Sequence, residues 1–234
     1  MMFASQPAES RLAAVRARIA RAAVEAGRTV ASVSLLAVSK TFDAEAVREL
    51  AACGQQAFGE NYVQEALDKQ SRLTDLSLEW HFIGPVQSNK TRAIAAHFSW
   101  VHSVDRLKIA ARLSEQRPEL LPPLQVCIEV NVSDEASKGG VTVADLPALA
   151  DAIALLPRLQ LRGLMAIPAP TMDRVAQRAA FRQVYQAFDA LSAQGHRLDT
   201  LSMGMSSDLE AAILEGATIV RVGTALFGER SYPR

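Results

Sequence analysis

The chain has 234 residues, the size of one large domain, and its 25 basic residues balance its 25 acidic residues. A net charge of zero argues against nucleic acid or an acidic membrane surface as the main partner. The two cysteines, Cys53 and Cys127, lie far apart in apolar segments, a pattern that indicates neither a disulfide framework nor a zinc site. The sequence shows neither a signal-peptide pattern nor the roughly 20 apolar residues of a membrane span. We therefore expect a soluble cytoplasmic protein.

A helix is expected near the N-terminus, over residues 10–27. Ser10 is a suitable N-cap and Gly27 a suitable stop. Between them, apolar residues recur at the spacing of one helix face, with arginines on the other side: Leu12, Val15, Ile19 and Ala23.

Short apolar runs alternate with helical patterns through the rest of the chain, which is typical of parallel βα units. The expected strands are Ser34–Ser39, Ala57–Gly59, Trp80–Ile83, Trp100–Ser103, Leu124–Asn131, Gln160–Ala166, Thr200–Met203 and Thr218–Val222. Eight strands favour an α/β fold in which a closed (β/α)₈ barrel of the TIM type spans residues 34–230. With its additional N-terminal helix it makes a single domain over residues 1–234. An open doubly wound sheet is the alternative, because short strands are easily miscounted.

The run LLAVSKT (Leu35–Thr41) predicts a buried strand that ends by presenting Lys40. Lysine is uncommon in this chain, with five lysines against twenty arginines. Burial disfavours the ammonium ion and favours the neutral amine, which can attack a carbonyl carbon. The alternative is a surface lysine whose stem covers apolar surface at a strand end.

The loops after the seventh and eighth expected strands both place small residues at the start of a helix. LSMGMSSD (Leu201–Asp208) supplies Ser206, and VRVGTALFGER (Val220–Arg230) supplies Gly223 and Thr224. Free N–H groups and hydroxyls at helix starts attract anions, and in barrels this pair of loops frequently binds phosphate. The alternative is two ordinary capped helices.

Arg221 is expected to point into the barrel, because Val220 and Val222 on either side of it face the helices. An inward arginine needs a partner, since its unpaired burial is costly. A structural salt bridge and a hydrogen bond to a ligand atom are both consistent with this position.

A reactive lysine, a phosphate site and an inward donor together suit an aldehyde that carries a phosphate. Pyridoxal 5′-phosphate (PLP), attached to Lys40 as a Schiff base with its ring nitrogen facing Arg221, is one such ligand. The substrate of a sugar-phosphate aldolase is another, and the residues alone leave both open.

The chain resembles the pyridoxal phosphate homeostasis proteins over about nine-tenths of its length. The motifs that carry the resemblance are LLAVSKT, FGENYVQE (Phe58–Glu65), WHFIGPVQSNK (Trp80–Lys90), GLMAIP (Gly163–Pro168), LSMGMSSD and VRVGTALFGER. The resemblance implies a barrel similar to the N-terminal domain of alanine racemase. It also implies that Lys40 holds PLP as an internal aldimine, with these further contacts: Ser206, Gly223 and Thr224 to the phosphate, Arg221 to the pyridine nitrogen, and Asn61 and Met165 along the ring.

We expect a PLP carrier rather than an enzyme, and the resemblance implies the same role in vitamin B6 homeostasis. An arginine opposite the ring nitrogen donates a hydrogen bond without giving up its proton, which weakens the coenzyme as an electron sink. Racemisation also needs a second acid or base, which racemases obtain from a further domain and a partner subunit. Tyr62 is the one tyrosine near the rim, and we expect it to pack at a helix start. The alternative function is a PLP-dependent enzyme of the racemase type acting on amino acids.

The remaining expectations concern partners. Apo PLP-dependent enzymes are candidate receivers of the coenzyme, and Lys90 and Lys138 are candidates for holding it in transit. We expect a monomer, because no large apolar stripe is left over. The four histidines show no metal-ligand spacing, and His81 is expected to be a packed core residue.

Overall fold

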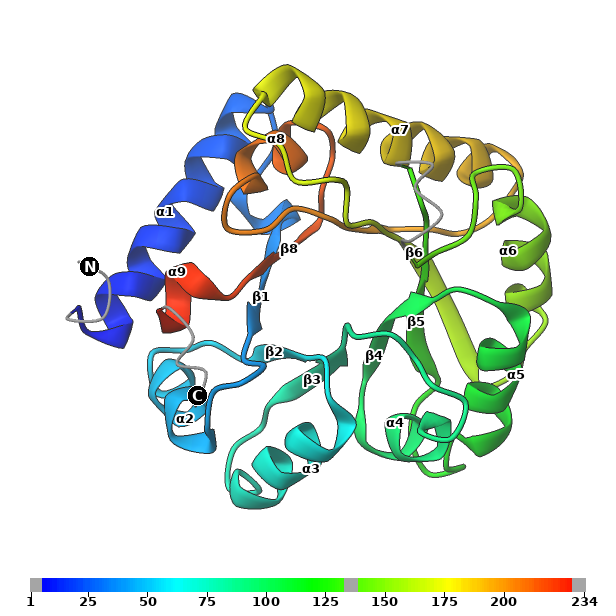
Figure 1. The fold of residues 1–234 in the computed structure, drawn as a ribbon, viewed down its shortest axis with the longest axis horizontal. Helices are drawn as coiled ribbons and strands as arrows, with labels where there is room; N and C mark the ends of the chain where they lie inside the picture. The colour runs from blue at the N-terminus through cyan, green and yellow to red at the C-terminus, as the bar shows by residue number, and fades with distance from the viewer. Residues whose placement is uncertain (1–5, 133–138, 229–234) are drawn as a thin grey trace.

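The computed structural model describes residues 6–132 and 139–228. Within these ranges eight parallel strands close into a barrel in chain order, with β1 paired to both β2 and β8 (Figure 1). The strands are β1 (Ser34–Val38), β2 (Ala57–Glu60), β3 (Glu79–Phe82), β4 (Trp100–Val104), β5 (Leu124–Glu129), β6 (Leu159–Met165), β7 (Thr200–Ser202) and β8 (Ile219–Val222). The predicted (β/α)₈ barrel is confirmed, and the open-sheet alternative is wrong.

Helices surround the barrel on its outer side, one after each strand (Figure 1). They are α2 (Ala44–Ala52), α3 (Val63–Arg72), α4 (Thr91–His97), α5 (Leu107–Gln116), α6 (Leu146–Ala154), α7 (Arg174–Ala193), α8 (Leu209–Leu214) and α9 (Thr224–Phe227). A short 3₁₀ turn, Val30–Ser32, precedes β1. None of the described helices is both long enough and apolar enough to cross a membrane.

The additional N-terminal helix, α1, runs from Ala8 to Glu25, two residues earlier at each end than expected. Pro7 rather than Ser10 is the N-cap, because its carbonyl accepts from the N–H of Arg11 over 3.1 Å while its ψ of 149° is not helical. Ser10 therefore lies inside the helix, and its predicted role as the N-cap is wrong. Gly27, with φ of +68°, takes the left-handed conformation just beyond the helix, as expected of its stop.

α1 packs against the outside of the barrel beside α8 and α9 (Figure 1). Its apolar face is buried, and its arginines reach across to the elements that follow β7 and β8. Arg18 Nε lies 2.7 Å from Glu210 Oε1 on α8, and Arg11 Nε donates to the carbonyl of Leu226 on α9 over 2.5 Å. The N-terminal helix therefore supports the two loops that the sequence assigns to phosphate binding.

The interior of the barrel contains both apolar and polar side chains. Trp100, Cys127 and Met165 form a small apolar cluster apart from the main core between strands and helices. Buried polar residues from four strands lie in the same interior, each no more than 4% exposed: His81, His102, Ser202 and Arg221. The prediction that Arg221 points inward and that His81 is a packed core residue is confirmed.

We expect Gly163→Ala to destabilise the fold strongly. Gly163 on β6 is paired with Thr200 on β7, and a Cβ at this position would lie 1.8 Å from the carbonyl oxygen of Thr200. The two strands would have to separate, so the free energy of unfolding in urea should fall by more than about 2 kcal/mol. Gly195→Ala is the matched control, because Gly195 also has a positive φ but no atom within 4 Å of its added Cβ. An equal loss in the two variants would contradict the steric explanation.

Candidate functional site

The predicted site residues come from strands β1, β2, β6, β7 and β8 and the segments that follow them. Because the strands are parallel, their carboxyl ends open on one end of the barrel, where (β/α)₈ enzymes place their active sites. Lys40 and Asn61 follow β1 and β2, and Ser206 and Thr224 follow β7 and β8. Since β8 is paired with β1, the first and last of these segments are neighbours in space.

Lys40 is half-buried in a tight turn directly after β1. The turn is anchored on both sides: the Ser39 N–H donates to the carbonyl of Gly59 on β2 over 3.0 Å, and the Phe42 N–H donates back to the Ser39 carbonyl over 3.1 Å. Thr41 has a φ of +70°, the only positive φ at a described non-glycine residue. A branched residue in the left-handed region is strained, so neighbouring groups have to hold the turn in place.

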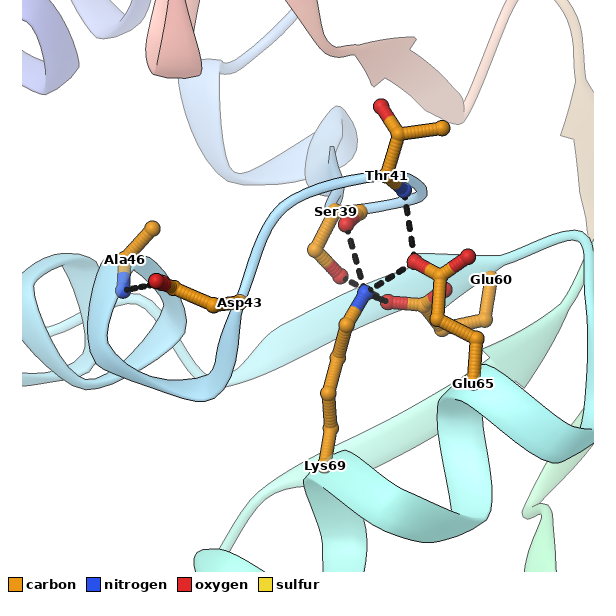
Figure 2. A network of polar contacts seen from close by, with 7 residues as sticks. All are labelled: Ser39, Thr41, Asp43, Ala46, Glu60, Glu65 and Lys69. Atoms are coloured by element: carbon orange, nitrogen blue, oxygen red, sulfur yellow. Dashed lines mark hydrogen bonds and ion pairs between the residues drawn. The ribbon is translucent and has the colours of Figure 1, made fainter. Parts of the chain in front are cut away.

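A buried lysine on α3 holds this turn (Figure 2). Lys69 Nζ donates to the carbonyl of Ser39 over 2.7 Å, and to Glu60 Oε1 and Glu65 Oε1 over 2.6 Å each. Glu65 Oε1 in turn accepts from the N–H of Thr41 over 2.6 Å. Lys69 and Glu65 therefore bind the backbone on the two sides of Lys40, and Glu60 holds the ammonium of Lys69. We call Lys69, Glu60 and Glu65 the turn clamp.

Glu60 is the most deeply buried member of the turn clamp, with no exposed side-chain surface. Burial raises the pKa of its carboxyl above the usual value, although the charge and hydrogen bond of Lys69 and the hydroxyl of Ser39 oppose that shift. Ser39 Oγ donates to Glu60 Oε1 over 2.6 Å, while Glu60 Oε2 is buried without a hydrogen-bond partner among the described residues. The ionised carboxylate at this position therefore depends on Lys69.

Arg221 projects from β8 into the barrel and is 4% exposed. Its Nη1 donates to the carbonyl and to the Oγ of Ser202, the latter over 2.8 Å, and its Nη2 donates to the carbonyl of Ala166 over 2.9 Å. None of the described carboxylates forms an ion pair with it, and its Nε has no hydrogen bond to any described residue. Burial lowers the pKa of Arg221 to about 10, and the charges of Asp208 and Glu129 oppose that shift. The guanidinium thus remains charged at neutral pH and has donor capacity left for another group.

Ser206 lies half-buried in the turn between β7 and α8. The backbone of this turn is fixed, because the N–H of Met205 donates to Asp208 Oδ1 over 2.6 Å and the carbonyl of Ser206 accepts from Arg18 Nη2 over 3.0 Å. Gly204 allows the sharp change of direction after β7, with a φ of +93° that a side chain would strain.

Gly223 and Thr224 lead from β8 into α9, whose first N–H groups have no acceptor within the helix. An added Cβ at Gly223 would lie 3.3 Å from the carbonyl oxygen of Val38, so this loop lies against the end of β1, close to Lys40 in sequence. Thr224 and Ser206 line one cavity of about 440 Å³ together with Arg11 and Arg18 of α1 and further residues. The structure therefore brings the two predicted phosphate loops together.

The two residues predicted to line a ring occupy different surroundings. Met165 ends β6 inside the barrel, where it is 1% exposed and adjoins Ala166, the acceptor of Arg221. Asn61 lines a separate cavity of about 330 Å³, with Phe82 and Lys90 among its neighbours, and not the cavity of the phosphate loops. Its Oδ1 is nevertheless buried without a hydrogen-bond partner among the described residues.

Comparisons with known proteins identify the family. The model of the alanine racemase N-terminal domain matches residues 11–231. A Pseudomonas aeruginosa protein named pyridoxal phosphate homeostasis protein is 66% identical over 221 residues, covering 94% of this chain and 95% of that protein. The chain belongs to the pyridoxal phosphate homeostasis protein family. An Escherichia coli protein of the same name is 54% identical over 226 residues, covering 95% of this chain and 97% of that protein.

Solved structures agree with this family assignment. PipY from Synechococcus elongatus, solved with PLP bound, is 42% identical, superposes with a TM-score of 0.84, and is matched over 94% of this chain and 100% of that chain. Alanine racemase from Corynebacterium glutamicum is 21% identical with a TM-score of 0.65, matched over 94% of this chain and 62% of that chain. The second likeness shows a shared barrel fold.

Two features of this family member differ from the sequence-based expectations or go beyond them. Tyr62 is 60% exposed rather than packed at the start of α3. The turn clamp was not expected, because Lys69 reads as one more charge on an amphipathic helix. Lys138 lies outside the described residues. Among the described residues, no three His, Cys, Asp or Glu side chains gather as a metal site would require.

Lys69→Met is expected to lower the free energy of unfolding by about 3 kcal/mol at neutral pH, because it leaves the Glu60 carboxylate buried without its cation. The loss should shrink as the pH falls. The raised pKa of Glu60 in the folded protein means that its protonated form favours folding at low pH, and this contribution is lost as the pH rises through that pKa. Urea denaturation between about pH 5 and pH 8 measures both effects.

The double variant Glu60→Gln with Lys69→Met is the control, because it removes the unpaired charge. It should recover part of the stability lost in Lys69→Met and show a weaker pH dependence. If the double variant is less stable than Lys69→Met at pH 8, the turn clamp does not act through the charge of Glu60.

Proposed function

We propose that this protein binds PLP at the carboxyl end of its barrel, covalently as a Schiff base on Lys40, and stores or delivers it in the cytoplasm without catalysing a reaction. The observation that carries the proposal is that one barrel presents Lys40 at its rim and a charged donor, Arg221, in its interior. The PLP-bound structure of PipY, which matches 94% of this chain, supports the same ligand.

The donor set fits the three functional groups of PLP. The amine of Lys40 suits an aldehyde, the unused donor capacity of Arg221 suits the lone pair of a pyridine nitrogen, and the loops after β7 and β8 suit a phosphate. The proposed phosphate contacts are Ser206, Gly223 and Thr224. Asn61, whose buried Oδ1 has no partner among the described residues, and Met165 would line the ring.

Lys40 supplies the covalent attachment. Its Nζ would hold the coenzyme through a Schiff base to the aldehyde carbon, with the aldehyde oxygen released as water. The turn clamp keeps the backbone on both sides of Lys40 fixed, so little conformational freedom is lost when the side chain is tethered.

Arg221 is the reason for proposing a carrier rather than an enzyme. Bound PLP supplies an electron sink whose strength depends on a protonated ring nitrogen. Arg221 keeps its own proton, because its pKa of about 10 is still far above that of a pyridine, and it therefore donates a hydrogen bond without protonating the ring. The relatives are named as homeostasis proteins.

Apo PLP-dependent enzymes are the proposed receivers of the coenzyme, and a monomer is the proposed oligomeric state.

Lys40→Ala should lose the covalent attachment of PLP. The wild-type protein loaded with PLP should be yellow, and borohydride should fix the colour on the peptide that contains Lys40, as shown by peptide mapping. Lys108→Ala is the matched control, since Lys108 is an exposed lysine on α5. It should keep both the colour and the labelled peptide.

The same preparations test the absence of catalysis. PLP-loaded wild-type protein should neither racemise free amino acids nor cleave sugar phosphates. Turnover that is present in the wild type and lost in Lys40→Ala would replace the carrier with an enzyme. Labelling of Lys90 or Lys138 in the wild type would identify a transit position.

A further inference from the structure

A line of buried polar side chains connects Arg221 to the opposite end of the barrel. Ser202 Oγ lies 2.8 Å from Arg221 Nη1 and 2.7 Å from His102 Nδ1. His102 Nε2 lies 2.8 Å from His81 Nδ1. His81 Nε2 lies 3.3 Å from Glu79 Oε2, an ion-pair contact without well-aligned hydrogen-bond geometry. Glu79 begins β3 and its side chain is 49% exposed, so the line ends at solvent.

The two ends of this line fix the direction of every hydrogen bond along it. Arg221 can only donate, so Ser202 Oγ accepts from it, and the arrangement that also leaves a ring N–H facing Glu79 is the one in which Ser202 donates its own proton to His102 Nδ1. His102 must then carry its proton on Nε2 and donate to His81 Nδ1. His81 likewise carries its proton on Nε2, facing Glu79, which as a carboxylate can only accept. One tautomer of each ring satisfies the whole line.

The charge states of the histidines agree with this arrangement. Burial lowers the pKa of His102 well below its usual value, and the charges of His81 and Arg221 add to the shift. Burial also lowers the pKa of His81, and it outweighs the opposing hydrogen bond and charge of Glu79. Both rings are therefore neutral at physiological pH, as single-donor links require.

We propose that Glu79 is a remote positioning residue for the PLP site, acting through His81, His102 and Ser202 on the guanidinium of Arg221. This inference rests on the proposed function, because the group that Arg221 faces is taken to be the PLP ring nitrogen. The carboxylate selects the tautomers of the two histidines, and these in turn keep the Ser202 hydroxyl oriented as an acceptor for Arg221. Supporting groups of this kind orient the residues that touch a ligand without touching it themselves.

Glu79→Gln tests the proposal with little risk to the fold, because the side chain is half exposed. An amide can donate as well as accept, so the direction of the line is no longer imposed. We expect nitrogen-15 NMR of the PLP-free protein at about pH 8 to show both His102 and His81 as neutral Nε2–H tautomers in the wild type. In Glu79→Gln we expect mixed tautomers.

The ligand readout uses PLP itself. We expect Glu79→Gln and Ser202→Ala each to weaken PLP binding by about fivefold to tenfold and to shift the absorption band of the bound coenzyme. The double variant should be no weaker than Ser202→Ala alone, because a line that is already cut at Ser202 no longer transmits a change at Glu79. Glu119→Gln, an exposed carboxylate in the loop before β5, should match the wild type.

The outcomes separate this inference from the proposed function. Wild-type protein that does not bind PLP defeats the proposed function. Wild-type protein that binds PLP, with a Glu79→Gln variant that keeps its affinity, its absorption band and the tautomers of both histidines, overturns the positioning role of Glu79 alone. Additive losses in the double variant also overturn it, since they show that Glu79 acts by another route.

Discussion

A charged guanidinium held inside a closed barrel is the interaction on which the rest of this structure depends. Arg221 is 4% exposed and has no ion-pair partner among the described carboxylates, so the hydrogen bonds that it makes to described residues all go to carbonyl and hydroxyl oxygens. Two of these come from Ser202 on β7 and one from Ala166 just after β6. Burying a charge in this way is costly unless its hydrogen bonds are fully organised. β7 and the end of β6 are therefore under a constraint that apolar packing alone would not impose.

The turn after β1 is under a second constraint of the same kind. The turn clamp places an ammonium between two carboxylates and binds the backbone at Ser39 and Thr41 (Figure 2). One carboxylate comes from the end of β2 and the other from α3, so residues of both elements hold the turn that carries Lys40. Both constraints fix backbone at the same end of the barrel, and between them they define where a ligand would have to lie.

The sequence predicts the barrel well because parallel strands are buried on both faces and read as apolar runs. Strand alternation is also enough to predict that Arg221 points inward. The turn clamp is beyond such rules, since the pattern of α3 does not show that Lys69 faces a strand end rather than solvent. Arg18 lines the same cavity as Ser206 and Thr224. Residues so far apart in the sequence form no local sequence pattern from which this cavity could be predicted. The start of α1 shows a different limit, because Pro7 and Ser10 are both acceptable helix-start residues and local rules do not choose between them.

The polar line through the barrel suggests why its interior is not filled with apolar side chains alone. An isolated Ser202 hydroxyl could accept from Arg221 with its own proton turned in more than one direction. His102 removes that freedom only if its own tautomer is fixed, and His81 fixes it only if something fixes His81 in turn. The position of the proton on each ring therefore depends on the next residue in the line. The last residue is Glu79, which can only accept when it is ionised. The carboxylate at one end of the barrel and the guanidinium near the other are thus complementary ends of one line of polar contacts, in which the contact between His81 and Glu79 is an ion-pair contact.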